Sequence, residues 1–295
     1  KVHIENADID KVLLCVCDEI TTILDLTDYW NKNLAPEELK VLNEIELPVS
    51  KVLAEMEYNG VSIDTKYLDD LSESMEENLE KLELQIYELA GCEFNINSPK
   101  QVGEVLFDKL GLKTKKRKKS TGAEVLEELA GEYEIAQKLL DYRKFAKLKS
   151  TYTDALPTLI SRKDNRIHTT FNQTVTTTGR LSSSNPNLQN IPARTEDGNK
   201  IRAAFIPKDK ENSVLLSADY SQIELRLLAH ISKDPHLIEA FNNNIDVHTL
   251  TASKVFEVPI EQVTKEMRYK AKAVNFGIIY GQSKYGLAKA VGISN

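Results

Sequence analysis

The chain has 295 residues, of which 41% are hydrophobic and 28% charged, and its formal net charge is −7. This length admits roughly two or three domains. No run of about 18 apolar residues occurs, so no membrane span is expected. The acidic balance argues against a protein covered in nucleic acid, although it allows a local basic track. Three cysteines are too few for a disulfide framework, which favours a cytoplasmic setting.

The first 60 residues are predicted to be helical. Residues 1–34 include a stretch at 15–29 that is rich in Leu, Ile and Thr. Residues 35–58 open with Ala35, Pro36 and two glutamates, a typical helix entry. Pro48 is expected to kink or break the second helix, because proline lacks an N–H. Gly60 is expected to end it.

Further helices follow along the first half. Residues 64–90 carry Leu, Ile and Met at helical spacing, which predicts a long amphipathic helix ended by Gly91. Ser98 is a predicted N-cap with Pro99 in the first turn. Residues 123–149 are predicted to be helical again.

Two basic segments lie on this helical half, a lysine run and the end of the last helix. A solvated surface is the commoner explanation of such a run. Two cationic segments on one helical unit nevertheless favour contact with a phosphate backbone, which needs positive charge but no sequence readout. The candidate residues are Lys115, Lys116, Arg117, Lys118, Lys119, Arg143, Lys147 and Lys149.

The pattern changes after Pro157. Residues 166–178 are rich in β-branched side chains and predict a strand, and residues 181–192 predict a polar loop that lies on the surface or binds a ligand. The apolar residues 214–216 predict a second, buried strand followed closely by Asp219. Together they predict a small sheet at the floor of a cleft. At this point Asp219 fits a turn residue and a rigidly held metal ligand equally well.

Helices are predicted again near the end, and the last of them carries chemistry. Arg268, Lys272, Phe276 and Tyr280 are each four residues apart, so on a helix they drift by ~120° over ~18 Å. One broad face then presents two cations followed by two rings. That order suits a nucleoside triphosphate, with the cations on phosphates and the rings on sugar or base. An amphipathic helix with a basic end is the alternative.

These segments resemble the family A DNA polymerases. Residues 219–226 resemble the family's motif A, and residues 268–281 fit its motif B, Arg-x3-Lys-x3-Phe-x3-Tyr-Gly. Residues 178–183 and 187–192 resemble the segment that holds the primer–template, and residues 147–152 resemble the thumb–palm junction.

The resemblance implies an α+β right-hand fold with a helical thumb, an antiparallel-sheet palm and helical fingers. It divides the chain into the end of a 3′–5′ exonuclease-like domain (1–34), a thumb (35–150), a palm with motif A (151–232) and the start of the fingers with motif B (233–295). Asp18 could align with the last metal-binding aspartate of the exonuclease domain, but Leu14 stands where its partner tyrosine would be. The other carboxylates of that site are expected to lie outside these residues, so no exonuclease activity is expected.

It also implies roles at the nucleotide. Two Mg²⁺ ions would be held by the Asp219 carboxylate and the Tyr220 backbone carbonyl, with Asp219, Arg268 and Lys272 catalytic. Arg268 and Lys272 would hold the phosphates, and Lys272 would also act as the acid for the pyrophosphate leaving group. Glu224 would exclude a ribose 2′-OH. Phe276 would pack on the sugar, Tyr280 would close the templating position, His248 would donate to the β-phosphate and Gln222 would support the site. The implied nucleotide-binding residues are Gln222, Glu224, His248, Arg268, Lys272, Phe276 and Tyr280.

For DNA, the resemblance implies minor-groove contacts that check pairing without reading sequence, and contacts that position the template. The implied residues, besides the basic ones above, are Ser150, Thr151, Arg180, Asn187, Gln189 and Arg194. The implied partners are primer–template DNA and dNTPs, in the cytoplasm with the nucleoid.

One element of the family is missing. Motif C, a His-Asp-Glu segment that supplies the second metal-binding carboxylate, occurs nowhere in these 295 residues. The chain is therefore expected to be inactive alone and to need a C-terminal polymerase fragment that carries motif C. Two alternatives remain: a non-catalytic primer–template binding module, and an RNA-synthesising relative, against which Glu224 and Phe276 argue.

Overall fold

The computed structural model of the chain describes residues 8–114, 120–193 and 195–291. The backbone divides into two compact units, Lys1–Leu215 and Leu216–Asn295, and each is described by itself. Within the described residues, no helix combines the length and the apolar character that a membrane crossing requires.

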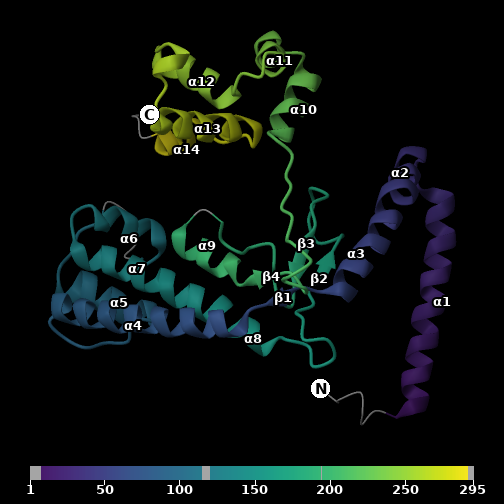
Figure 1. The fold of residues 1–295 in the computed structure, drawn as a ribbon, viewed down its shortest axis with the longest axis horizontal. Helices are drawn as coiled ribbons and strands as arrows, with labels where there is room; N and C mark the ends of the chain where they lie inside the picture. Colours follow the sequence, from purple (N-terminus) through teal and green to yellow (C-terminus); the bar gives the residue numbers. More distant parts are fainter. Residues whose placement is uncertain (1–7, 115–119, 194, 292–295) are drawn as a thin grey trace. The chain divides into compact units, whose positions relative to one another are not determined.

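In its described residues, the first unit is mostly helical with four short strands (Figure 1). Its helices and helical turns are α1 (Ile9–Asn33), α2 (Pro36–Val41), η2 (Leu42–Glu46), α3 (Leu47–Asn59), α4 (Thr65–Ala90), α5 (Pro99–Gly103), η3 (Glu104–Lys109), α6 (Ala123–Ala130), α7 (Glu134–Leu148), η4 (Lys149–Thr153), α8 (Ala155–Thr158) and α9 (Glu196–Ala203). Its strands are β1 (Ser62–Ile63), β2 (Thr170–Asn172), β3 (Ser182–Ser184) and β4 (Phe205–Ile206).

The predicted helix ends are largely confirmed. The Asp64 carboxylate accepts from the Tyr67 N–H at 3.1 Å and caps α4, and Gly91 ends that helix with a φ of 64°. Ser98 caps α5 with Pro99 in its first turn. Pro48 does not break the helical path, because the π-helical turn η2 leads directly into α3 and places Pro48 at its start, where a missing N–H is tolerated.

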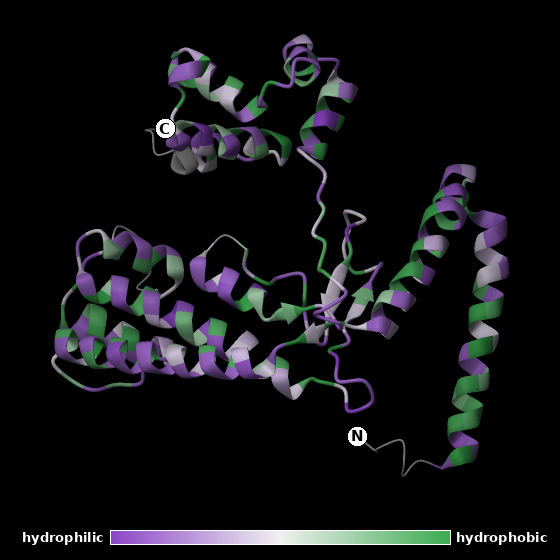
Figure 2. Ribbon diagram, in the orientation of Figure 1, coloured by the Kyte–Doolittle hydropathy of each residue, from purple (hydrophilic) through white to green (hydrophobic). Residues whose placement is uncertain are grey.

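Two apolar cores hold the first unit together. The later part of α4 packs against α7 and with α5, η3 and α6 around Ile86, Leu106, Leu126 and Leu139. The earlier part of α4 joins η4, α8, α9 and the strand pair β1–β4 in a second core. No residue of α1, which the structure describes throughout, is buried, although hydrophobic residues recur along it (Figure 2).

The predicted strand at 166–178 is much shorter in the structure. Only β2 forms within these described residues, and it pairs antiparallel with β3, which lies in the segment predicted as a loop. The polar side chains of that segment satisfy its own backbone: Ser183 Oγ accepts from the Leu188 N–H at 2.8 Å, and Thr169 Oγ1 donates to the Pro186 carbonyl at 2.7 Å. In this segment, hydrogen bonds from side chains to the nearby backbone therefore take the place of further backbone pairing between β2 and β3.

The predicted buried strand at 214–216 is wrong. Residues 213–220 have no regular structure, and the side chains of Val214 and Leu216 are 85% and 88% exposed. A strand needs a neighbour to pair with, and none of the described strands pairs with this segment. The sheet floor predicted beneath Asp219 is consequently absent from the described part of the chain.

Gly60 provides a stability test of the first unit. It ends α3 with a φ of 59° and a ψ of −168°, and a Cβ there would lie 2.6 Å from the Ile167 carbonyl oxygen. We expect Gly60→Ala to lower the free energy of unfolding by about 3 kcal/mol, because only glycine adopts this conformation without strain.

The matched control is Gly131→Ala. Gly131 ends α6 in a helical conformation, and a methyl group added there would lie 3.7 Å from its nearest neighbour, the Glu128 carbonyl oxygen. That change should move the stability by less than about 1 kcal/mol. Denaturant unfolding followed by circular dichroism checks both variants, and equal losses would contradict the argument.

Candidate functional site

The second unit brings the predicted nucleotide-binding residues together. It consists of α10 (Ile223–Ser232), α11 (Pro235–Asn242), α12 (Val247–Phe256), the 3₁₀ turn η5 (Ile260–Gln262), α13 (Lys265–Ile279) and α14 (Lys284–Val291). The side chains of Asp234, Asp246 and Thr264 cap the starts of α11, α12 and α13. Helix α12 packs along α13, so that the start of α12 faces the first turns of α13.

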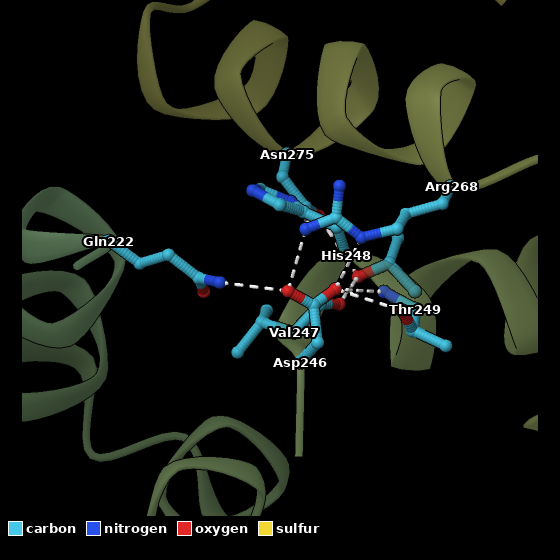
Figure 3. A network of polar contacts seen from close by, with 8 residues as sticks. Gln222, Asp246, Val247, His248, Thr249, Arg268 and Asn275 are labelled. Carbon is cyan, nitrogen blue, oxygen red and sulfur yellow. Dashed lines mark hydrogen bonds and ion pairs between the residues drawn. The ribbon is translucent and has the colours of Figure 1, made fainter. Parts of the chain in front are cut away.

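Asp246 is the centre of a hydrogen-bond network (Figure 3). Its Oδ1 accepts from Arg268 Nε at 3.0 Å, and its Oδ2 accepts from Arg268 Nη2 at 2.8 Å. Oδ1 also caps α12 by accepting from the Thr249 N–H at 2.8 Å and from Thr249 Oγ1 at 2.9 Å. Gln222 Nε2, from the turn before α10, donates to Oδ2 at 3.0 Å.

The network keeps Asp246 ionised. Burial alone would raise the pKa of this carboxyl, but the hydrogen bonds from Arg268 and Thr249 outweigh burial and hold the pKa well below its usual range. The hydrogen bond to Asp246 in turn raises the pKa of Arg268. The pair is a charged, bidentate carboxylate–guanidinium contact at neutral pH.

His248 lies beneath α13 and is only 2% exposed. Asn275 places its Nδ2 3.0 Å from His248 Nδ1, and the Asn275 Oδ1 accepts from Thr251 Oγ1 at 3.0 Å. In this orientation of the amide, Nδ2 donates to the ring Nδ1, which corresponds to a neutral ring with its proton on Nε2. Burial, more than any other influence, lowers the pKa of His248, which favours this neutral form.

The cations and rings predicted for one face of α13 do share it. The rings of Phe276 and Tyr280 stack with centroids 6.2 Å apart, and Lys272 Nζ lies 5.9 Å from the Phe276 centroid. His248 packs on the same ring at 5.8 Å. Just past the end of α13, the Tyr280 hydroxyl donates to both carboxylate oxygens of Glu224, at 3.0 and 2.9 Å.

Asp219 and Tyr220 lie in the exposed, irregular segment before α10. The carboxylate and the carbonyl are hard oxygen donors of the kind that Mg²⁺ prefers. The described residues contain no cluster of three His, Cys, Asp or Glu side chains that could hold a metal.

The predicted DNA-binding residues of the first unit fall into two groups. The exposed group consists of Lys147, Ser150, Thr151, Arg180, Asn187 and Gln189. Arg143 instead donates to the Thr121 carbonyl, and burial lowers its pKa, while Lys149 pairs with Glu76 at 3.1 Å and Asp154 at 2.9 Å. The lysine run Lys115–Lys119 and Arg194 lie outside the described residues.

Sequence reasoning missed Asp246 and Asn275 as members of the site. Asp246 carries a signal, since an aspartate three residues before a threonine at a helix start is a typical cap, but the cap does not reveal its partner Arg268. Asn275 directly precedes Phe276 in the motif helix. Its role depends on the packing of α12 on α13, which the sequence does not show.

The second unit thus carries a candidate nucleotide site on its helices. The chain belongs to DNA polymerase family A, whose family model matches residues 65–295. It is 52% identical over 261 residues to the DNA polymerase I of Geobacillus stearothermophilus, covering 88% of this chain and 30% of that protein. Over 298 residues it is 47% identical to the DNA polymerase I of Rhizobium leguminosarum, covering 99% of this chain and 29% of that protein.

A solved structure supports the same fold. The POL domain of Pol1 from M. smegmatis, in complex with DNA primer–template and dNTP, matches with a TM-score of 0.83 and 44% identity, covering 92% of this chain and 48% of that chain. The predicted family and the predicted α+β polymerase fold are therefore confirmed. The chain spans about 30% of the length of the curated relatives named above.

Proposed function

We propose that this chain forms the nucleotide-binding part of a template-directed DNA polymerase, with residues 35–150 as thumb, 151–232 as palm and 233–295 as the start of the fingers. The observation that carries the proposal is the face of α13, where Arg268 and Lys272 precede the stacked rings of Phe276 and Tyr280. The resemblance to DNA polymerase I relatives supports it.

In the proposed reaction, Arg268 and Lys272 bind the phosphates of a dNTP and offset the charge that develops as pyrophosphate leaves. Lys272 donates a proton to that leaving group. Phe276 packs on the sugar. His248 donates to the β-phosphate through its Nε2–H and packs on the Phe276 ring.

Glu224 is proposed to select the sugar. Its carboxylate is held by the Tyr280 hydroxyl and fills the space that a ribose 2′-OH would need. Tyr280 closes the templating position. Selection of the sugar and of the template base would therefore both depend on the hydrogen-bonded pair of Glu224 and Tyr280.

Asp219 and the Tyr220 carbonyl would hold Mg²⁺, which when bound polarises the phosphate and lowers the pKa of the primer hydroxyl. The second carboxylate that two ions require would come from a polypeptide carrying motif C. Primer–template DNA would contact the exposed residues of the first unit: Lys147, Ser150, Thr151, Arg180, Asn187 and Gln189.

The test uses a chimaera in which residues 1–295 are followed by the remaining C-terminal part of the Geobacillus stearothermophilus DNA polymerase I. We expect this chimaera to extend a primer with Mg²⁺ and dNTPs, and the Lys272→Ala chimaera to extend it about 100-fold more slowly, because a phosphate-binding cation is lost. Gel electrophoresis of the primer measures both rates.

The control is Lys270→Ala, which removes a neighbouring lysine of α13 that pairs with Glu266 at 2.8 Å. It should leave the rate nearly unchanged. Binding of duplex DNA without any extension by the folded chimaera would contradict the proposal and favour the non-catalytic binding module.

A further inference from the structure

Asp246 has a place in the structure that the proposed reaction does not yet use. It lies where three elements meet: the turn before α10, the N-cap of α12 and the first turns of α13 (Figure 3). From the described residues, its two carboxylate oxygens accept five hydrogen bonds, donated by Gln222, Thr249 and Arg268. A carboxylate with this many donors is fixed in both position and orientation.

The contact with Arg268 leaves part of the guanidinium available. Arg268 uses Nε and one N–H of Nη2 toward Asp246, and a guanidinium has five N–H groups in one plane. In the described part of the chain, no other hydrogen bond engages this guanidinium, and the Arg268 side chain is 45% exposed. The remaining edge can therefore meet phosphate oxygens while the opposite edge stays on Asp246.

We propose that Asp246 is a positioning residue for the incoming nucleotide: it holds the Arg268 guanidinium by one edge, aims the other edge at the triphosphate, and ties it to the turn that carries Gln222. This inference rests on the proposed function. The advantage is that the long arginine side chain is ordered before the nucleotide binds, so its conformational entropy is not lost at that step.

A competing interpretation is that Asp246 is a latch that imitates a phosphate and is displaced by the nucleotide. Its contacts with Thr249 argue against displacement. Asp246 is the N-cap of α12, and those two hydrogen bonds hold the carboxylate without any help from Arg268. Moving it away would uncap the helix, so the carboxylate is a fixed anchor.

The bond to Gln222 extends the anchor to the other side of the site. Gln222 lies between Asp219 and Glu224 and has a left-handed backbone, with a φ of 51°. Its Oε1 is buried and, among the described residues, has no hydrogen-bond partner, so the orientation of the amide depends on the Nε2 donation to Asp246. Asp246 thus links the segment with the metal and sugar residues to the phosphate-binding cation.

The test is Asp246→Asn, because asparagine caps a helix as well as aspartate but lacks the charge and presents an N–H₂ group toward the site. The matched control is Asp234→Asn, since Asp234 caps α11 by accepting from the Leu237 N–H at 2.8 Å and, within the described structure, pairs with no arginine. Both variants keep a capping side chain, so both should fold like the wild-type chain by circular dichroism.

Two measurements separate this inference from the proposed function. In the 295-residue chain, NMR of the arginine Nε–H groups should show a slowly exchanging Arg268 signal that Asp246→Asn abolishes and Asp234→Asn does not. In the chimaera, Asp246→Asn should raise the KM for dNTP roughly 20-fold with a smaller change in kcat, and should add nothing once Arg268 is alanine.

Tighter dNTP binding by Asp246→Asn would establish the latch and overturn the inference, as would an unchanged KM. An additional loss in the Arg268→Ala background would show that Asp246 does not act through Arg268. A protected Arg268 signal in a chimaera that cannot extend a primer would instead refute the proposed function and leave the anchored guanidinium intact.

Discussion

Asp219→Asn is expected to reduce primer extension by the chimaera at least about 1,000-fold, which corresponds to roughly 4 kcal/mol of transition-state stabilisation. Asp219 is exposed in an irregular segment, and no described side chain donates a hydrogen bond to it or pairs with it. Its replacement should therefore leave the fold unchanged. The loss would follow from weaker binding of a cation, since the asparagine amide carries no charge.

Three readouts make this prediction sharp. The melting temperature of Asp219→Asn should match the wild type, duplex DNA binding should be retained, and the Mg²⁺ concentration for half-maximal extension should rise. Asp234→Asn, a change at the aspartate that caps α11, should keep the full rate. Extension within about tenfold of wild type at low Mg²⁺ would remove Asp219 from the metal site.

The sequence predicted those elements whose signals are local. Ser98 was predicted as an N-cap and does cap α5, because a short polar side chain beside a helical run satisfies the first free N–H groups wherever it occurs. The shared face of Arg268 and Phe276 was also predictable, because it depends only on the turn of the helix.

The sequence did not predict what depends on a distant partner. The triplet at 214–216 has the composition of a buried strand, but burial requires a neighbouring strand, and no described strand pairs with it. The contact of Asp246 with Arg268 spans 22 positions in the sequence and arises only when α12 packs on α13. Arg143 and Lys149 were likewise predicted to contact DNA, because the sequence does not show that Arg143 donates to the Thr121 carbonyl and that Lys149 pairs with Asp154.

Glu224→Ala is the second large effect that we expect. In the chimaera it should lower the preference for dNTPs over ribonucleotides, measured as the ratio of the two kcat/KM values, by roughly 100-fold, or about 2.7 kcal/mol. Glu224 lies in the first turn of α10, and the Tyr280 hydroxyl binds both of its carboxylate oxygens. Removing the carboxylate opens the space beside the sugar, so the ribonucleotide rate should rise more than the dNTP rate falls.

Tyr280→Phe separates the bulk of Glu224 from the hydrogen bonds that hold it. The phenylalanine keeps the stacked ring next to Phe276 but cannot donate to the carboxylate, which then keeps its volume and loses its fixed position. The sugar preference should fall by only about tenfold. Glu239→Ala, an exposed glutamate of α11, is the control and should leave it unchanged. If Tyr280→Phe lowered the sugar preference as much as Glu224→Ala does, the orientation of the carboxylate would determine sugar selection. If Glu224→Ala left the sugar preference unchanged, Glu224 would take no part in sugar selection.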